Sequence, residues 1–242
     1  PAPGHVRWRD DRVGLLVGAG LAVALFVVGW LRFANTWATI DLALFDQALW
    51  KMAHGQSPNL TVLDENLFGD HFSPAILVLV PLYRIVATPL WLIAAQALAI
   101  GLAVPAMRGL ARQIGASQSL AAVATVLSAP LFAAAVFDVH PVVATVPVTA
   151  AAIAAGLRDD RRAVTILAVA IVLLRADAAM LLLGVAVLAT PRCRNRLLVI
   201  APVGMAVGVI VPVLLHSEQT FTRYWGHLGS GPLDAALHPW RL

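Results

Sequence analysis

The chain has 242 residues, of which 60% are hydrophobic and 12% are charged, and its mean hydropathy is +0.83. Because a soluble domain carries roughly 25% charged residues, this composition excludes an ordinary soluble protein and predicts an integral membrane protein. The net charge of +4 and the pI near 10.2 would suit a nucleic-acid-binding protein, but the basic residues form short clusters between apolar stretches, a pattern typical of cytoplasmic loops that argues against a nucleic-acid partner.

The first predicted membrane element is the charge-free stretch 13–31, whose length is close to the roughly 20 apolar residues that a spanning helix needs. Three later stretches also lack charge, 113–137, 142–157 and 197–215. Basic clusters flank these stretches, and the positive-inside rule places them, with the N-terminus, in the cytoplasm. The clusters are Arg7, Arg9 and Arg12; Arg108 and Arg112; Arg158, Arg161 and Arg162; and Arg192, Arg194 and Arg196.

The segment 72–84, which contains Pro74 and Pro81, is expected to enter the membrane without crossing it. Inward and outward helices then alternate in agreement with the charges, and irregular backbone is tolerated at membrane depth where protein covers it. The chain is thus predicted to be all-α, a single transmembrane domain over 1–242 with about seven membrane elements, located in the bacterial cytoplasmic membrane. Residues 239–242 read as the start of another helix, so we expect the protein to continue.

The loop 35–71 follows the first membrane element and is expected outside the cytoplasm. With this topology nine of the thirteen acidic residues and six of the seven histidines lie on the outer side, although only Arg and Lys were used to assign it. This distribution predicts that the functional site faces outward. The loop itself holds Asp41, Asp46, Asp64, Glu65, Asp70, His54 and His71.

Residues 40–54 are predicted to form an amphipathic helix on the outer membrane surface, with Gly55 ending it. Asp41 and Asp46 flank its apolar stripe, so both could face the rim of a cavity beneath the helix. Asp41 has an alternative interpretation as a first-turn acid that the helix dipole favours. The apolar stripe consists of Leu42, Phe45, Leu49 and Met52.

Two Asp–His pairs lie at predicted membrane ends. Asp70 and His71 close the outer loop, where a bend after Gly69 could aim both inward. Asp138 and His140 are two residues apart, so in an extended segment they share a side. Ionisable groups at the end of a membrane span suggest function, although wetting at the interface is an alternative explanation for each pair.

Two further outer segments carry candidate binding residues. Arg175 and Asp177 interrupt an otherwise apolar run. Arg175 could clasp a lipid phosphate, or the two residues could form a solvated ion pair in a hairpin turn. Tyr224 and His227 follow the last charge-free stretch, where an aromatic belt would place tyrosine without any function.

The sequence suggests no specific cofactor except a divalent metal ion, for which Asp70, Asp138 and His140 are the candidate ligands. Cys193 is the single cysteine, which excludes an internal disulfide and a cysteine-based zinc site. Phosphate-binding loops, dinucleotide fingerprints and H-E-x-x-H spacing are absent from the sequence. Membrane lipids are expected partners.

Five ordered motifs resemble a family of predicted bacterial membrane proteins of unknown function. Many members of that family read Lys-Glu-Asp at positions 175–177, so the alanine at position 176 argues against a direct role for that position. The motifs are Asp41-Leu-Ala-Leu-Phe-Asp46-Gln-Ala-Leu-Trp50, Gly69-Asp-His-Phe-Ser-Pro74, Phe137-Asp-Val-His-Pro141, Arg175-Ala-Asp177-Ala-Ala and Tyr224-Trp-Gly-His-Leu-Gly229.

This family in turn distantly resembles the GT-C membrane glycosyltransferases, which share an outward first helix, an outer loop with a surface helix and an acid near its start, and a second acidic site. The resemblance implies a GT-C-like fold and sugar transfer from a polyprenyl-phosphate donor to an acceptor outside the cytoplasm. Asp46 or Asp41 would be the general base. Arg175, with His71 or His140, would stabilise the departing phosphate, and Asp70 and Asp138 would order the site or hold a metal.

Two other functions stay open. A transporter or flippase for a lipid-linked or anionic solute would use the ionisable residues as relay or binding groups. A structural subunit of an envelope complex would leave the outer acids merely solvated. Convergence of the candidate residues on one outward cavity would favour an enzyme, a continuous polar path would favour transport, and scattered residues would favour the structural role.

Overall fold

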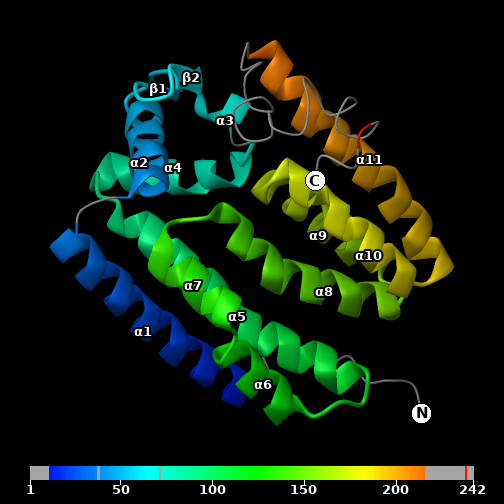
Figure 1. Cartoon of the computed structure of the whole chain (residues 1–242). Helices are drawn as coiled ribbons and strands as arrows, with labels where there is room; N and C mark the ends of the chain where they lie inside the picture. Colours follow the sequence, from blue (N-terminus) through cyan, green and yellow to red (C-terminus); the bar gives the residue numbers. More distant parts are fainter. Residues whose placement is uncertain (1–10, 37–38, 71, 216–237, 239–242) are drawn as a thin grey trace.

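The computed structural model describes residues 11–36, 39–70, 72–215 and 238. In this part of the chain the protein is helical apart from one two-stranded hairpin (Figure 1). The elements are α1 (Arg12–Thr36), α2 (Ile40–Ala53), β1 (Asn59–Leu60), β2 (Glu65–Asn66), α3 (Leu67–Asp70), η2 (Pro74–Leu79), α4 (Val80–Ile85), α5 (Leu90–Gln113), α6 (Gln118–Val126), α7 (Ala129–Phe137), η3 (Pro141–Ala144), α8 (Thr145–Leu157), α9 (Arg161–Leu174), η4 (Ala176–Met180), α10 (Leu181–Leu188) and α11 (Pro191–Leu214).

Four helical segments of the described chain are long and apolar enough to cross a membrane: α1, α5, the joined α6–α7 segment Gln118–Phe137, and α11. The prediction of an all-α membrane protein is confirmed, but four elements reach spanning length where about seven were expected. Shorter apolar helices occupy other predicted elements, at Pro74–Ile85, Pro141–Leu157 and Ala176–Leu188. Prolines explain part of this difference, since Pro74 and Pro141 begin new short helices in or beside the apolar stretches.

The segment Pro74–Ile85 consists of a 3₁₀ helix that continues into α4. Twelve α-helical residues would extend roughly 18 Å, well short of a hydrocarbon core of about 30 Å. This length agrees with the expectation of a partial membrane element. A proline lies near the start of each of its two helices, where it separates them into short segments.

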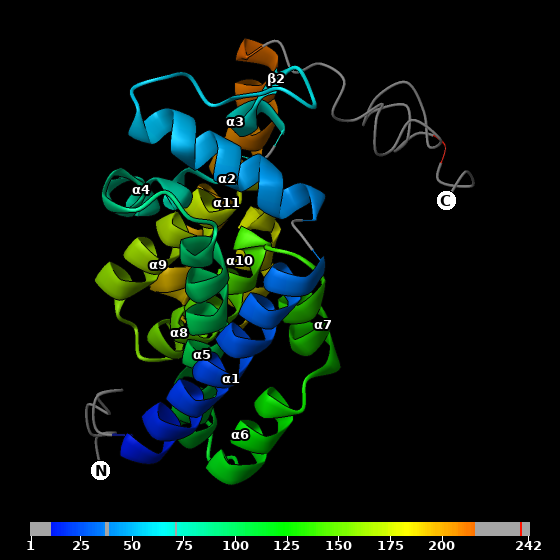
Figure 2. The same cartoon turned by 90° about the vertical axis from the view of Figure 1, so that its left-hand side faces the viewer.

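Helices α1 and α5 pack side by side (Figures 1 and 2). Gly18 and Gly101 allow this approach, since a Cβ atom on either would lie 2.4 Å from the carbonyl oxygen of the other. At the opposite end from α2, the buried Asp11 carboxylate pairs with Arg108, the two closest atoms being 2.8 Å apart. The ion pair and the close glycine contact together fix α1 against α5.

Helix α2, the β hairpin and α3 gather at one end of the long helices, which we call the α2 end (Figures 1 and 2). The helix predicted at 40–54 is confirmed, and Gly55 follows it with a positive φ of +73°. Its apolar stripe packs on protein rather than on lipid: Leu42, Phe45 and Leu49 are buried in one cluster with Tyr83 and Leu92.

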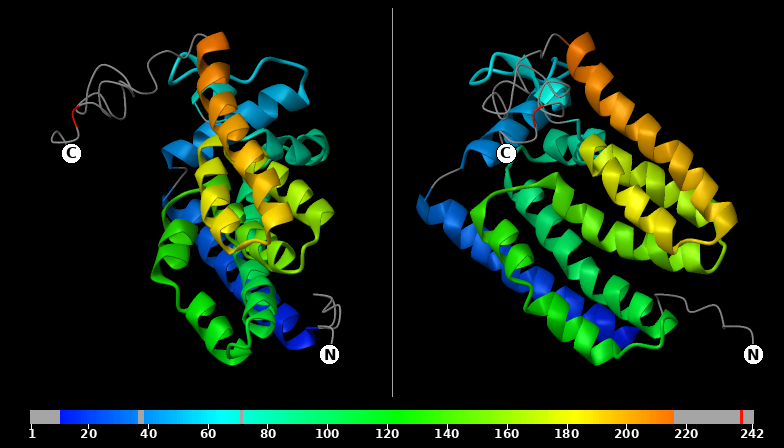
Figure 3. Two further views of the ribbon diagram at one scale, coloured as in Figure 1. Left: turned by 90° about the vertical axis from the view of Figure 1, so that its right-hand side faces the viewer. Right: turned by 45° about the vertical axis from the view of Figure 1, so that its right-hand side comes forward.

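Helices α8 to α11 form a second cluster beside α5 (Figure 3). At the end away from α2, the Asp159 carboxylate accepts a 2.6 Å hydrogen bond from the Thr190 hydroxyl. The Thr190 N–H also donates to the carbonyl of Gly156. These bonds hold the α8–α9 turn against the start of α11.

Candidate functional site

The start of α2 is held by a carboxylate from a distant part of the chain. Asp138, which is buried, accepts hydrogen bonds from the N–H groups of Asp41 at 3.1 Å and Leu42 at 2.9 Å, and also from the N–H of Val139. Asp41 and Leu42 are the second and third residues of α2, whose N–H groups a helix-capping side chain normally satisfies. Asp138 therefore caps α2 from 96 residues away, and the cap residue Thr39 makes no side-chain capping bond.

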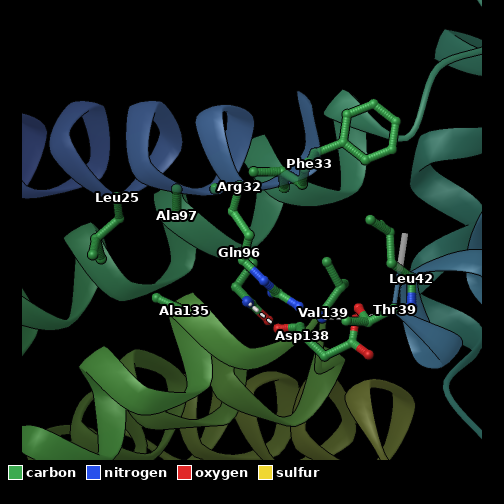
Figure 4. Close-up of a pocket in the computed structure, with 12 residues that line it drawn as sticks. Leu25, Arg32, Phe33, Thr39, Leu42, Gln96, Ala97, Ala135, Asp138 and Val139 are labelled. Carbon is green, nitrogen blue, oxygen red and sulfur yellow. Dashed lines mark hydrogen bonds between the residues drawn. The ribbon is translucent and has the colours of Figure 1, made fainter. Parts of the chain in front are cut away.

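Gln96, in the second turn of α5, fixes the segment that carries Asp138 (Figure 4). Its side-chain amide donates to the carbonyl oxygens of Ala134 at 3.0 Å and Asp138 at 2.7 Å. Its side-chain oxygen accepts the N–H of His140 at 2.6 Å. Sequence reasoning missed Gln96, although a lone amide within an apolar helix is the signal that could have identified it.

His140 and Asp41 come together at the α2 end. The Nδ1 atom of His140 lies 3.4 Å from a carboxylate oxygen of Asp41, an ion-pair distance that is longer than an ordinary hydrogen bond. Both side chains are about a quarter exposed. The backbone is extended at positions 138 and 140, and both residues reach the start of α2. Their two-residue spacing predicted a shared side but not this helix as its partner.

Asp46 lies on another side of α2 and contacts the buried Tyr83 of α4. The Tyr83 hydroxyl donates a 2.7 Å hydrogen bond to the Asp46 carboxylate. Burial raises the pKa of Asp46 above its usual 3.8, although the bond from Tyr83 opposes part of this effect. Asp46 does not line the apolar groove described below. Its hydrogen bond with Tyr83 instead anchors α2 to α4.

An apolar groove with a volume of about 130 Å³ lies beside His140. Three of the sequence motifs meet along it, because residues from within or next to each line its wall. The groove is lined by Ala75, Ile76, Val78, Leu79, Leu92, Ala95, Gln96, Ala99, Val139, His140, Pro141, Ala144 and Leu174.

The Gly69–Pro74 motif and the Arg175–Asp177 motif meet through their backbones, since the N–H of Ala176 donates to the carbonyl of Phe72. Arg175 Nε lies 2.9 Å from one carboxylate oxygen of Asp177 and 3.0 Å from the other. This geometry matches the ion-paired turn that was one of the two interpretations of these residues. A phosphate-binding role for Arg175 stays a prediction.

The remaining candidates are less constrained by the structure. Asp70 ends the short helix α3, and His71, Tyr224 and His227 lie outside the described residues. Among the residues described, no three histidine, cysteine or acidic side chains form a metal-binding group. The predicted metal ligands Asp138 and His140 instead contact the start of α2. Sequence reasoning also missed Tyr83, one of only two tyrosines and a polar group in the short apolar segment.

Comparison with known proteins identifies the family. Residues 35–241 match the model of a family of predicted membrane proteins, DUF2079, and the match begins where the first long helix ends. The chain matches none of the curated proteins and none of the solved structures with which it was compared. Since the family model covers most of the sequence and the fold carries several apolar helices of spanning length, the chain belongs to this family of membrane proteins.

Proposed function

We propose that the protein is a GT-C-like glycosyltransferase that moves a sugar from a polyprenyl-phosphate donor to an acceptor on the extracytoplasmic side. The observation that carries the proposal is the meeting of motifs at one place. The Asp41–His140 pair stands at the α2 end, and His140 also lines the apolar groove. The groove suits the hydrocarbon chain of a lipid-linked substrate, and the polar pair suits its reacting end.

In this proposal Asp41 is the general base. It takes the proton of the acceptor hydroxyl while the acceptor oxygen bonds to the anomeric carbon of the sugar. The bond between that carbon and the phosphate oxygen breaks, and its electron pair leaves with the lipid phosphate. His140, 3.4 Å from Asp41 and on the groove wall, donates a hydrogen bond to the departing phosphate.

Asp41 suits the base better than Asp46 does. Asp46 is bound by the Tyr83 hydroxyl, whereas Asp41 sits beside a groove-lining histidine. Asp138 and Gln96 serve as positioning residues, since Asp138 holds the backbone of Asp41 and Gln96 holds that of His140. The convergence of Asp41, Asp138 and His140 favours an enzyme over a structural subunit with scattered acids.

Deletion of the full-length gene and its replacement by variants tests this function. We expect loss of one envelope glycan, with accumulation of its polyprenyl-phosphate sugar, when the deleted gene is restored as Asp41→Asn. The wild-type gene should rescue both, as measured by mass spectrometry of envelope glycans and lipid extracts. Unchanged glycans in the deletion strain would refute glycosyl transfer.

Asp64→Asn is the matched control, because it makes the same chemical change in the same predicted outer loop. Asp64 is exposed and has a positive φ of +54°, a conformation that asparagine also tolerates. The control should restore the glycan fully. Full rescue by Asp41→Asn as well would remove Asp41 from the reaction.

A further inference from the structure

A second groove lies at the surface of the α2 end, between the C-terminal part of α2 and the segment η2–α4, which pack together (Figure 2). It is open to the surroundings and has a volume of about 420 Å³. Since roughly 10–15 Å³ of such space holds one water molecule, the groove has room for a phosphate group with the glycerol and first chain carbons of a lipid. We call it the Arg84 groove, and the function proposed above does not use it. Its lining residues are Met52, Gln56, Leu77, Val80, Pro81 and Arg84.

Arg84 is the charged member of this lining. Its Nε atom donates a 3.1 Å hydrogen bond to the carbonyl oxygen of Ala53, the last residue of α2, and this bond holds the guanidinium beside the groove. The other N–H donors of the guanidinium, on Nη1 and Nη2, bond to no residue that the structure describes. Within the described ranges, no acidic side chain forms an ion pair with Arg84. The groove therefore presents a positive charge that these residues leave uncompensated.

The Arg84 groove lies at the level where lipid head groups meet hydrocarbon. Arg84 shortly precedes Leu90, the first residue of α5, and α5 is long enough to span the membrane. Trp91, in the first turn of α5, donates its indole N–H to the carbonyl of Val86 at 3.0 Å, and tryptophan is enriched at membrane interfaces. Ile85 and Val86 are 78% and 53% exposed, as residues that face lipid would be. An arginine at this level can lay its stem on apolar surface while its charge stays among the head groups.

The rest of the lining combines an apolar wall with one amide. Leu77, Val80 and Pro81 supply hydrocarbon surface, and Leu77 and Pro81 are exposed, so a ligand can reach them. Gln56 follows the end of α2 and is also exposed. Its side chain makes no hydrogen bond to any described residue, so the amide can donate to a ligand. A free inorganic anion would not use the apolar wall, whereas a lipid would use both the wall and the polar groups.

We propose that the Arg84 groove binds an anionic phospholipid of the membrane. The Nη groups of Arg84 donate to the phosphate oxygens, Gln56 donates to the phosphate or the glycerol, and the first carbons of the chains lie against Leu77 and Pro81. A planar guanidinium suits phosphate oxygens, and a head group with net negative charge compensates the charge of Arg84. Because Arg84 also bonds to the end of α2, the bound lipid links α2 to the bilayer. This site is separate from the groove beside His140 and does not require the protein to transfer sugar.

The test measures lipid binding to the purified full-length protein in a non-ionic detergent by native mass spectrometry. A short-chain phosphatidylglycerol is the probe, the diacylglycerol with the same chains is the probe without phosphate, and glycerol phosphate is the probe without chains. We expect phosphatidylglycerol to bind the wild type at least tenfold more tightly than either of the other two. Equal binding of the diacylglycerol would reduce the groove to an apolar patch, and equal binding of glycerol phosphate would refute a lipid ligand.

A competition experiment distinguishes a membrane phospholipid from the lipid-linked substrate of the proposed function. A polyprenyl phosphate is added to the complex of the protein with phosphatidylglycerol. We expect the phosphatidylglycerol to stay bound at equal concentrations of the two lipids. Its complete displacement by the polyprenyl phosphate would assign the groove to that substrate and overturn the proposal.

Variants assign the site to Arg84. Arg84→Gln should weaken binding of phosphatidylglycerol at least tenfold, while Arg162→Gln, an exposed change at the other end of the bundle, should leave it unchanged. Gln56→Glu places a negative charge beside the phosphate and should weaken binding several-fold. Since Gln56 is exposed, this second variant tests the site even if Arg84→Gln disturbs the end of α2. Wild-type affinity in both Arg84→Gln and Gln56→Glu would overturn the assignment.

Discussion

Asp138→Ala removes the carboxylate that accepts two N–H groups in the first turn of α2 and one in its own segment. A hydrogen bond to a charged group contributes about 1.5–3 kcal/mol, and loss of a helix cap costs about 0.5–2 kcal/mol. We therefore expect the first turn of α2 to lose about 2–4 kcal/mol of local stability. Because about 1.4 kcal/mol corresponds to a factor of ten, its opening should become roughly 30- to 1,000-fold more frequent.

Hydrogen–deuterium exchange of the purified protein measures this opening directly. The amides of Asp41 to Phe45 should exchange faster in Asp138→Ala, while those of α11, which Asp138 does not contact, keep their wild-type rates. Asp138→Asn should give an intermediate effect, since the amide keeps one acceptor oxygen. Asp177→Ala removes an exposed carboxylate and should not alter α2. Wild-type protection of α2 in Asp138→Ala would refute the trans cap.

Three further predictions concern the bundle and the anchoring of α2. Gly18→Ala should lower the Tm of the protein, because the new Cβ would lie 2.4 Å from the Gly101 carbonyl oxygen. Gly20→Ala, whose Cβ would meet open space, should be neutral or stabilising by up to about 1 kcal/mol. Equal melting temperatures of the two variants would contradict the close α1–α5 contact. Burial raises the pKa of Asp46, so the folded state favours the neutral form of this carboxyl. The protection of the α2 amides from hydrogen exchange should therefore fall as the pH rises from 3.8 through the raised pKa. Asp46→Asn should remove this step from the pH profile of exchange, and an unchanged profile in that variant would show that Asp46 does not contribute. Cys193 is fully buried, so a maleimide should label it only after unfolding in sodium dodecyl sulfate, and rapid labelling of the folded protein would contradict the packing of α11.

Local patterns in the sequence predicted the helix at 40–54 and its end at Gly55, because helical periodicity and a left-handed glycine act over a few residues. The apolar stretches likewise predicted a helical membrane protein. The number of spanning helices was harder to predict, since a proline such as Pro74 can begin a new short helix inside one apolar run.

The partners of the candidate residues depend on packing between distant segments. Asp41 and Asp138 were both candidates, but nothing local indicates that Asp138 caps the helix that carries Asp41. Gln96 makes three hydrogen bonds to the segment that carries Asp138, and Tyr83 makes one to α2. The positions of these two residues in apolar runs were the available signal.

The central claim is that the apolar groove beside His140 holds the chain of a lipid-linked substrate. Photolabelling of the full-length protein with a polyprenyl phosphate that carries a diazirine in its chain tests it most directly. Ala99→Phe would fill the groove, and Leu98→Phe makes a similar change at the neighbouring position, where the side chain is 56% exposed and lies outside the groove lining.

We predict that mass spectrometry will find the label on peptides from η2, α5 and η3 in the wild type and in Leu98→Phe, and that Ala99→Phe will abolish this labelling. Labelling confined to the exposed faces of α1 and α11, or labelling that persists unchanged in Ala99→Phe, would contradict the account.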